Sequence, residues 1–384
     1  MKTKNTGGNV LIYFLLILSA CVEPYDSPVN SISNSYLVVE GIISDGKSIF
    51  QLSRTSHLNE GSTFLETNAQ IYVENESGTQ TYLLDEREEG LYEAVLDLDT
   101  EDQYRIKIYT ADDTEYVSDF VPITASPEID SLTWELVNEE AVQLYVTAHD
   151  PANNTRYYRW TYEETWQYHA PFYSNLEYVD GEIVYRDFVN NAIFDCWQSR
   201  ASTQILVGST VQLQEDVVYK QPLLAINPRS NSRLDVKYSI LVRQYALTKE
   251  AFEYWELLKK NSENLGTLFD PQPSQLPGNM HCTTRPDEPV LGYISAGAVT
   301  EKRLFIRRSE IPIHIPYNRN PSCTIDTIPV FPPNLLVDAF AQGDTIPLNP
   351  VYGFRDIIGY EASSAYCVDC RTRGGTNVRP DFWE

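Results

Sequence analysis

The feature that most constrains the fold is a series of short apolar runs, separated by turn residues, that fills the first third of the chain. From Tyr36 these runs alternate apolar and polar side chains, which is the pattern of strands buried on one face. Asp45-Gly46 and Ser77-Gly78 fall between runs, where tight turns favour glycine. We therefore expect a small antiparallel β-sandwich of about seven strands over residues 34–125.

Composition supports the same class. The chain of 384 residues holds 26 tyrosines and six tryptophans but only two methionines, and aromatic rings pack well on pleated sheets. Its length allows two domains of about 150–200 residues each. Pro127, among polar residues, marks the expected boundary. We expect a second, β-rich domain over residues 126–384, so the predicted fold is mainly β.

The clearest strand of the second domain runs from Tyr157 to His169. Alternation along a strand places five aromatic rings on one of its faces. Such a face can be the domain core, which we favour because burial with a period of two explains it. It could also be a ligand-binding surface for a glycan or a peptide. The five rings belong to Tyr158, Trp160, Tyr162, Trp166 and Tyr168.

One prominent amphipathic helix is expected near residues 249–264. Ala251, Trp255 and Leu258 recur at helical spacing and give a single apolar stripe. Thr248 suits the N-cap position, and Gly266 suits the C-terminal cap.

The N-terminus has the pattern of a bacterial lipoprotein signal. Two lysines precede an apolar run that is shorter than the ~20 residues needed to span a bilayer. The run ends in Leu18-Ser19-Ala20-Cys21, small residues before a cysteine. We expect residues 1–20 to be a signal peptide and Cys21 to carry lipid. Residues 21–33, rich in Pro, Ser and Asn, then form a stalk.

Export predicts an oxidising compartment, where disulfides are expected. Beyond Cys21 the number of cysteines is odd, so at most two bridges form within one chain, and the sequence does not give their connectivity. Cys367 and Cys370 have the spacing of a redox pair or of half a metal site. The oxidising compartment and the lack of a helical pattern favour instead a structural disulfide that holds the C-terminal tail. The candidate disulfide cysteines are Cys196, Cys282, Cys323, Cys367 and Cys370.

Charge and motifs narrow the classes of function. Lys and Arg number 29 against 54 Asp and Glu, a net charge of −25, which disfavours nucleic-acid partners. The acidic run over residues 97–102 lacks the glycine and distal glutamate of a calcium loop, so a solvated turn is favoured. The sequence has no nucleophile elbow and no phosphate-binding glycine loop. We predict no catalytic residues, no metal site and no cofactor.

Several motifs, taken in order, resemble a known family. They are Leu241-Val242-Arg243-Gln244-Tyr245, Phe269-Asp270-Pro271, Pro277-Gly278-Asn279, Cys367-Val368-Asp369-Cys370 and Pro380-Asp381-Phe382-Trp383. The chain is similar to the outer-membrane lipoproteins of Bacteroidota grouped as domain of unknown function 4249. The resemblance implies that the N-terminal sandwich is immunoglobulin-like or carboxypeptidase-regulatory-like. It also implies genes near those of TonB-dependent transporters, and no reaction.

These features together predict a non-enzymatic lipoprotein anchored to the outer membrane through lipid on Cys21, on the periplasmic face or the cell surface. We expect it to be an accessory or ligand-capturing partner of a TonB-dependent transporter, an outer-membrane barrel. The alternative is a free-standing surface binding module or adhesin for glycan or peptide that uses the ring face of residues 157–169.

Overall fold

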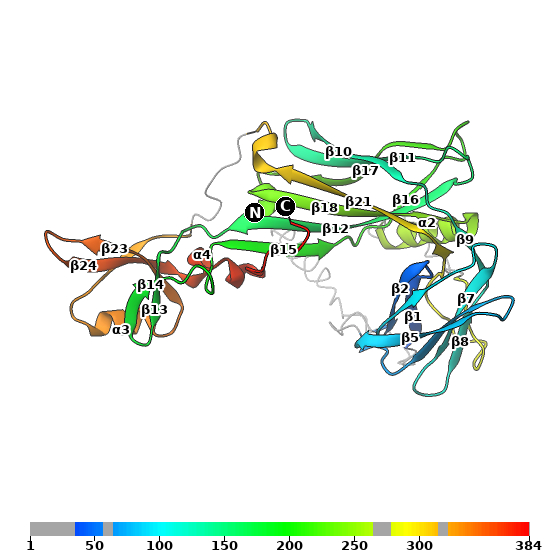
Figure 1. Cartoon of the computed structure of the whole chain (residues 1–384), viewed down its shortest axis with the longest axis horizontal. Coiled ribbons are helices and arrows are strands. Elements are labelled where there is room, and N and C mark those ends of the chain that lie inside the picture. The colour runs from blue at the N-terminus through cyan, green and yellow to red at the C-terminus, as the bar shows by residue number, and fades with distance from the viewer. Residues whose placement is uncertain (1–34, 57–63, 264–277, 314–321, 384) are drawn as a thin grey trace, which may run out of the picture. The chain divides into compact units, whose positions relative to one another are not determined.

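The computed structural model describes residues 35–56, 64–263, 278–313 and 322–383. The chain divides into two compact units, Met1–Ser35 and Tyr36–Glu384, and the elements below all belong to the second unit. Strands dominate these ranges, so the predicted mainly β class with sandwich-like sheets is confirmed (Figure 1). The expected signal peptide, the Cys21 lipidation site and the stalk lie outside the described residues.

The N-terminal strands form a sandwich around one continuous core. Its hydrogen-bonded order is β1-β2-β6-β5-β4-β7-β8, with β3 on β2 and β9 on β7. Ile71 on β4 and Ile106 on β7 are fully buried, whereas polar neighbours in the sequence point outward. The strands are β1 (Leu37–Ile42), β2 (Gly46–Arg54), β3 (Phe64–Leu65), β4 (Gln70–Asn75), β5 (Thr81–Glu88), β6 (Leu91–Leu96), β7 (Gln103–Tyr109), β8 (Glu115–Ser118) and β9 (Val121–Thr124).

A segment from much later in the chain completes this sandwich. β19 (Met280–Cys282) pairs with β8, and β20 (Ala296–Gly297) pairs in parallel with β9. The Val39 amide donates to the carbonyl of Leu291 at 2.8 Å, and Met280 joins the first core. A single boundary at residue 126 does not account for this late segment, because residues 280–297 pair with the backbone edges of the first sandwich.

Two further sheets form a second sandwich. One has the order β10-β11-β17, and the other has the order β15-β12-β18-β21 with β16 also on β12. Side chains from both sheets meet in one core. The elements are β10 (Ile129–Val137), β11 (Ala141–His149), β12 (Tyr157–His169), β15 (Asp195–Ala201), β16 (Leu206–Ser209), β17 (Val217–Ile226), η1 (Ser232–Leu234), β18 (Lys237–Ala246), β21 (Val299–Arg307) and η2 (Arg308–Glu310).

The predicted amphipathic helix is α2 (Lys249–Glu263), which lies close to its expected bounds. Its first turn is held by Thr248, whose hydroxyl accepts a hydrogen bond from the Ala251 amide at 3.2 Å, as an N-cap side chain does. Ala251 and Tyr254 are buried, and the helix packs against β12 and β16. No described helix is long and apolar enough to cross a membrane.

The remaining elements pack together beyond the second sandwich. Asp180 and Gly181 have positive φ values of 51° and 92° and close a tight hairpin, as an Asp-Gly pair predicts. A separate sheet has the order β22-β24-β23. The elements are β13 (Leu176–Val179), β14 (Glu182–Tyr185), β22 (Asp326–Pro329), α3 (Asn334–Phe340), β23 (Thr345–Tyr352), β24 (Ile357–Ser364), α4 (Ala365–Val368) and η3 (Cys370–Arg373).

Candidate interaction surface on a disulfide-bonded module

Two segments that are distant in the sequence fold together into what we call the disulfide module, residues 172–194 and 322–370. Backbone hydrogen bonds join the segments. The Asn175 amide donates to Leu348 O at 3.0 Å, and the Phe172 amide donates to Cys367 O at 3.0 Å. The side-chain amide of Asn175 also donates to Asn349 Oδ1 at 2.7 Å. The module is therefore a product of tertiary pairing and not of local sequence.

The apolar core of the module is small. Ile193, Leu348 and Val368 form its buried cluster, and Phe172 and Ile346 are partly buried against them. Leu176, Phe340 and Ala362 are buried elsewhere in the described part of the module. A 72-residue module with so few buried apolar side chains needs other sources of stability. Polar bonding and disulfides supply them.

A buried arginine provides part of the polar bonding. Arg186 Nη2 donates to Leu176 O at 2.6 Å and to Ser174 Oγ at 3.1 Å. Its Nη1 atom lies 3.7 Å from Glu177 Oε2. Burial lowers the pKa of Arg186, and the nearby Glu177 charge opposes that shift. The guanidinium thus links the β13–β14 hairpin to the segment that contacts β23.

Two disulfides hold the module. Cys323 pairs with Cys367 inside it, and Cys196 on β15 pairs with Cys370 at its end. The expected disulfides are therefore present, with Cys367 and Cys370 each bonded to a partner outside their own motif. The fifth candidate cysteine, Cys282, has a free thiol and is buried in the first sandwich.

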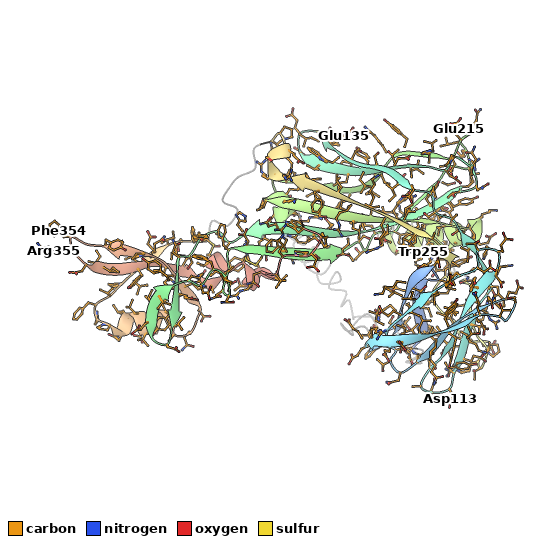
Figure 2. All side chains as sticks on the ribbon, in the orientation of Figure 1. Asp113, Glu135, Glu215, Trp255, Phe354 and Arg355 are labelled. Carbon is orange, nitrogen blue, oxygen red and sulfur yellow. A yellow bond between two sulfur atoms is a disulfide. The ribbon has the colours of Figure 1, made fainter. Side chains whose placement is uncertain are left out.

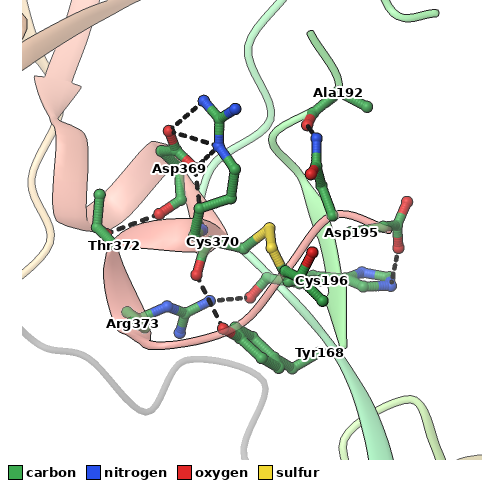
Figure 3. The surroundings of a disulfide bond; sticks show 12 residues. Tyr168, Ala192, Asp195, Cys196, Asp369, Cys370, Thr372 and Arg373 are labelled. Carbon is green, nitrogen blue, oxygen red and sulfur yellow. Dashed lines mark hydrogen bonds and ion pairs between the residues drawn. A yellow bond between two sulfur atoms is a disulfide. The ribbon is translucent and has the colours of Figure 1, made fainter. Parts of the chain in front are cut away.

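Hydrogen bonds surround the Cys196–Cys370 bridge (Figure 3). The Tyr168 hydroxyl donates to Cys370 O at 2.8 Å, and the Arg373 guanidinium donates to His169 O. The same guanidinium stacks over the Tyr168 ring, with its central carbon 4.7 Å from the ring centroid. This bridge therefore ties the C-terminal segment to strands β12 and β15 of the second sandwich.

The module presents an unusual amount of apolar surface. Among the described residues, 14 of the 25 exposed large apolar side chains belong to it. Surface apolar residues gathered in this way mark interaction sites more often than single exposed residues do. They are Tyr173, Val179, Val184, Tyr185, Phe188, Val189, Ile325, Phe331, Val337, Tyr352, Phe354, Ile357, Ile358 and Tyr366.

The tip of the β23–β24 hairpin is the most exposed part of this surface. Phe354 is 97% exposed, and Tyr352 is 66% exposed. The Gly353 amide donates to Asp356 O at 2.8 Å and closes the turn, which leaves Phe354 and Arg355 at its end (Figure 2). A phenyl ring held in water at a rigid turn loses little conformational entropy on binding. The tip is the part of the module best suited to anchor a partner.

The aromatic strand predicted as either core or binding face is core. Its rings are between 0% and 8% exposed and lie inside the second sandwich. The indole nitrogen of Trp160 donates to Gln244 Oε1 at 2.9 Å within that core. The ligand-binding interpretation of this face is therefore wrong, because the β10-β11-β17 sheet covers it. The residues concerned are Tyr158, Trp160, Tyr162, Trp166 and Tyr168.

Sequence reasoning missed the interaction surface. Its signal is present in the sequence as apolar residues around tight turns, such as Tyr352-Gly353-Phe354. Such residues are equally common in cores, and the sequence does not say which segments pack on them. Among the described residues, no group of His, Cys, Asp and Glu side chains is arranged to hold a metal ion.

The fold and this surface define a multi-sandwich β protein with a disulfide-bonded module. The sequence profile of the family described as "Domain of unknown function (DUF4249)" matches residues 22–303, and the chain belongs to this family. The match ends before the disulfide module's second segment, so the C-terminal cysteine motif lies outside it. A search of curated protein sequences gives no match.

Two solved structures are similar over parts of the chain. The first is trypsin-activated alpha-2-macroglobulin from Escherichia coli, at 14% identity and a TM-score of 0.19, which covers 56% of this chain and 15% of that one. The second is the FN1-FN3 domains of chicken CNTN1, at 11% identity and a TM-score of 0.17, which covers 55% of this chain and 62% of that one. The chain thus spans less than two thirds of either protein, and similarity this low carries no argument about function.

Proposed function

We propose that the chain is a lipid-anchored accessory protein of the outer membrane that docks onto a TonB-dependent transporter through its disulfide module. The observation that carries the docking step is the gathering of exposed apolar side chains on that module. The lipoprotein signal that ends in Cys21 supports the anchoring, and the family resemblance supports the choice of partner.

The charge of the module favours a protein partner over direct contact with a membrane surface. It carries ten acidic residues and only two basic ones, Arg186 and Arg355. Anionic lipid surfaces repel such a module, because binding to them relies on clusters of Lys and Arg. A module that combines exposed apolar side chains with an excess of acidic residues suits a protein interface, which has an apolar centre and a polar rim.

The test is a pull-down of the epitope-tagged native lipoprotein from outer membranes in mild detergent, with mass spectrometry of the recovered proteins. We expect a TonB-dependent barrel in stoichiometric amount. We also expect Phe354→Ser to reduce its recovery at least tenfold without changing the thermal midpoint, because the 97% exposed ring makes few contacts within the chain.

Val95→Ser is the matched control. Val95 is 78% exposed on β6 of the first sandwich, outside the disulfide module, so its loss should leave recovery unchanged. Isolation of the lipoprotein alone from wild-type membranes would contradict the transporter proposal. Undiminished recovery with Phe354→Ser would contradict the assignment of the docking surface.

A further inference from the structure

A second feature, on a different part of the chain, is an arginine that has an aromatic partner but no hydrogen-bonding partner. Arg159 lies on β12, on the sheet face opposite the core rings, directly across from Tyr245 on β18. Among the described residues, none forms a hydrogen bond or an ion pair with its guanidinium group. Arg186, which is buried, and Arg233, which is partly buried, both have such partners.

Helix α2 covers this face and holds the guanidinium in place. The central carbon of Arg159 lies 3.7 Å from the ring centroid of Trp255 and 5.7 Å from that of Tyr245. Trp255, labelled on the helix in Figure 2, is itself supported edge-on by Tyr254, with ring centroids 5.5 Å apart. Stacking uses the flat face of a guanidinium and leaves the N–H donors at its edge free.

Arg159 is partly exposed, and among the described residues its guanidinium nitrogens are not among the fully buried side-chain atoms that lack a hydrogen-bond partner. Glu40 on β1 is the acidic residue whose charge acts on Arg159, but Glu40 is exposed and forms no ion pair with it. Burial also lowers the pKa of Arg159, because water is removed from the charged group. A charge that is poorly hydrated and unpaired is destabilising unless something compensates it.

We propose that Arg159 and Trp255 form a binding site for a carboxylate attached to an apolar or aromatic group. A guanidinium edge matches a carboxylate, which accepts two parallel N–H bonds. The ring beside it gives the apolar part of the same ligand a surface to stack on. The proposal does not depend on the transporter, because it rests on residues outside the disulfide module.

The ligand specificity of the proposed site follows from the charge of the chain and from the two side chains that form the site. The chain carries a net charge of −25, which repels small anions in general. Retention of a ligand therefore requires direct hydrogen bonds to the guanidinium and contact with Trp255. The site should reject the same aromatic ring without its charge, and should also reject a bare anion without a ring.

The probe is benzoate, with benzamide and inorganic phosphate as comparisons, added to the full chain and followed by tryptophan fluorescence and by calorimetry. We expect saturable binding of benzoate alone. Arg159→Met should weaken it at least tenfold, since the variant keeps the apolar stem but loses the charge-assisted bonds. Trp255→Leu should weaken it as well. Glu40→Gln should strengthen it, because a competing negative charge is removed.

Arg243→Met is the matched control. Arg243 lies two residues from Tyr245 on the same face of β18, but it is already paired with Glu301 at 2.6 Å, so its loss should leave benzoate binding unchanged. A thermal melt provides a second readout. Without ligand, Arg159→Met should melt at the same temperature as the wild type or higher, whereas an arginine with a purely structural role would lower the melting temperature when replaced.

Three results would overturn the proposal. One is the absence of saturable benzoate binding to the folded wild type. Another is equal binding of benzamide or phosphate, which would show that the site does not recognise an aromatic carboxylate. The third is a folded Arg159→Met variant that binds benzoate as well as the wild type does.

Discussion

Removal of the Cys323–Cys367 disulfide should unfold the disulfide module while both sandwiches stay intact. The perturbation is the double substitution Cys323→Ser with Cys367→Ser, which leaves the Cys196–Cys370 bridge in place. The Cys323–Cys367 bridge that is removed closes a loop with a sequence separation of 44 residues. Loop-closure entropy for that length corresponds to about 4 kcal/mol.

That loss must be compared with the burial of apolar side chains in the module. The larger ones are Leu176, Ile193, Phe340, Leu348 and Val368, and they contribute roughly 8–15 kcal/mol at ~1.5–3 kcal/mol each. The entropy of ordering the chain opposes this contribution. The double variant should therefore open the module locally, and a change of ~4 kcal/mol corresponds to about a thousandfold higher population of the open form.

Amide hydrogen exchange measures this directly. The amides of Phe172 and Asn175, which donate across the module to Cys367 O and Leu348 O, should lose their protection. The amides of β12 and β18 should keep theirs, because they belong to the second core. Exchange confined to the module would show that it is a separate cooperative unit.

Cys282→Ser is the control, because it replaces a cysteine with a serine without removing a disulfide. Cys282 is buried and unpaired, and its sulfur accepts a hydrogen bond from the Arg285 amide at 3.3 Å, a role that a serine oxygen can also fill. This variant should leave exchange in the module unchanged. Wild-type protection at Phe172 and Asn175 in the double serine variant would refute the reasoning, and so would uniform acceleration across both sandwiches.

Three further predictions concern the second sandwich. Trp160→Ala should destabilise the fold by ~3–5 kcal/mol in urea unfolding, because the ring is fully buried and bonded to Gln244; a stable variant would show that the ring face is not core. Glu164→Ala should cost ~3–5 kcal/mol, because it leaves Arg233 and the Tyr238 hydroxyl without their shared carboxylate; guanidinium unfolding that is unchanged from wild type would contradict this. Asp130 raises the pKa of His149 above its ordinary value of 6.5 by hydrogen bonding and charge attraction. The stabilisation is therefore complete below pH 6.5 and is lost as pH rises through the raised pKa. His149→Gln should lower the melting temperature at pH 5.5 but not at pH 9, and equal effects at both would disprove the link.

Local patterns predicted much of the fold. Alternation located the strands of both sandwiches, and the helix expected near 249–264 is α2 at Lys249–Glu263. An Asp-Gly pair such as Asp180-Gly181 favours a tight hairpin, because the turn needs positive φ at both positions. Period-two burial predicted that the face with Trp160 belongs to the core. Each of these predictions depends on residues close together in the sequence.

The sites were not accessible to the same reasoning. Nothing near Phe354 in the sequence distinguishes it from a core phenylalanine, and its 97% exposure results from the pairing of β23 with β24. Arg159 alternates with the core rings on β12, which places its side chain on the opposite face of the strand. Its stacking on Trp255, and the lack of an ion partner within the described chain, depend on how helix α2 folds back over the sheet.

The sequence by itself determined the mainly β class, the strand faces, the helix and the family resemblance, because periodicity and turn chemistry are local properties. The tertiary structure decided which cysteines pair, the return of residues 280–297 to the first sandwich, and, among the described residues, which apolar side chains stay exposed and which arginine lacks an ion partner. These depend on contacts between segments that are distant in the sequence, such as Cys323 and Cys367 at a separation of 44 residues and Cys196 and Cys370 at a separation of 174. Many pairings satisfy the same local patterns, and only the packed chain selects one of them.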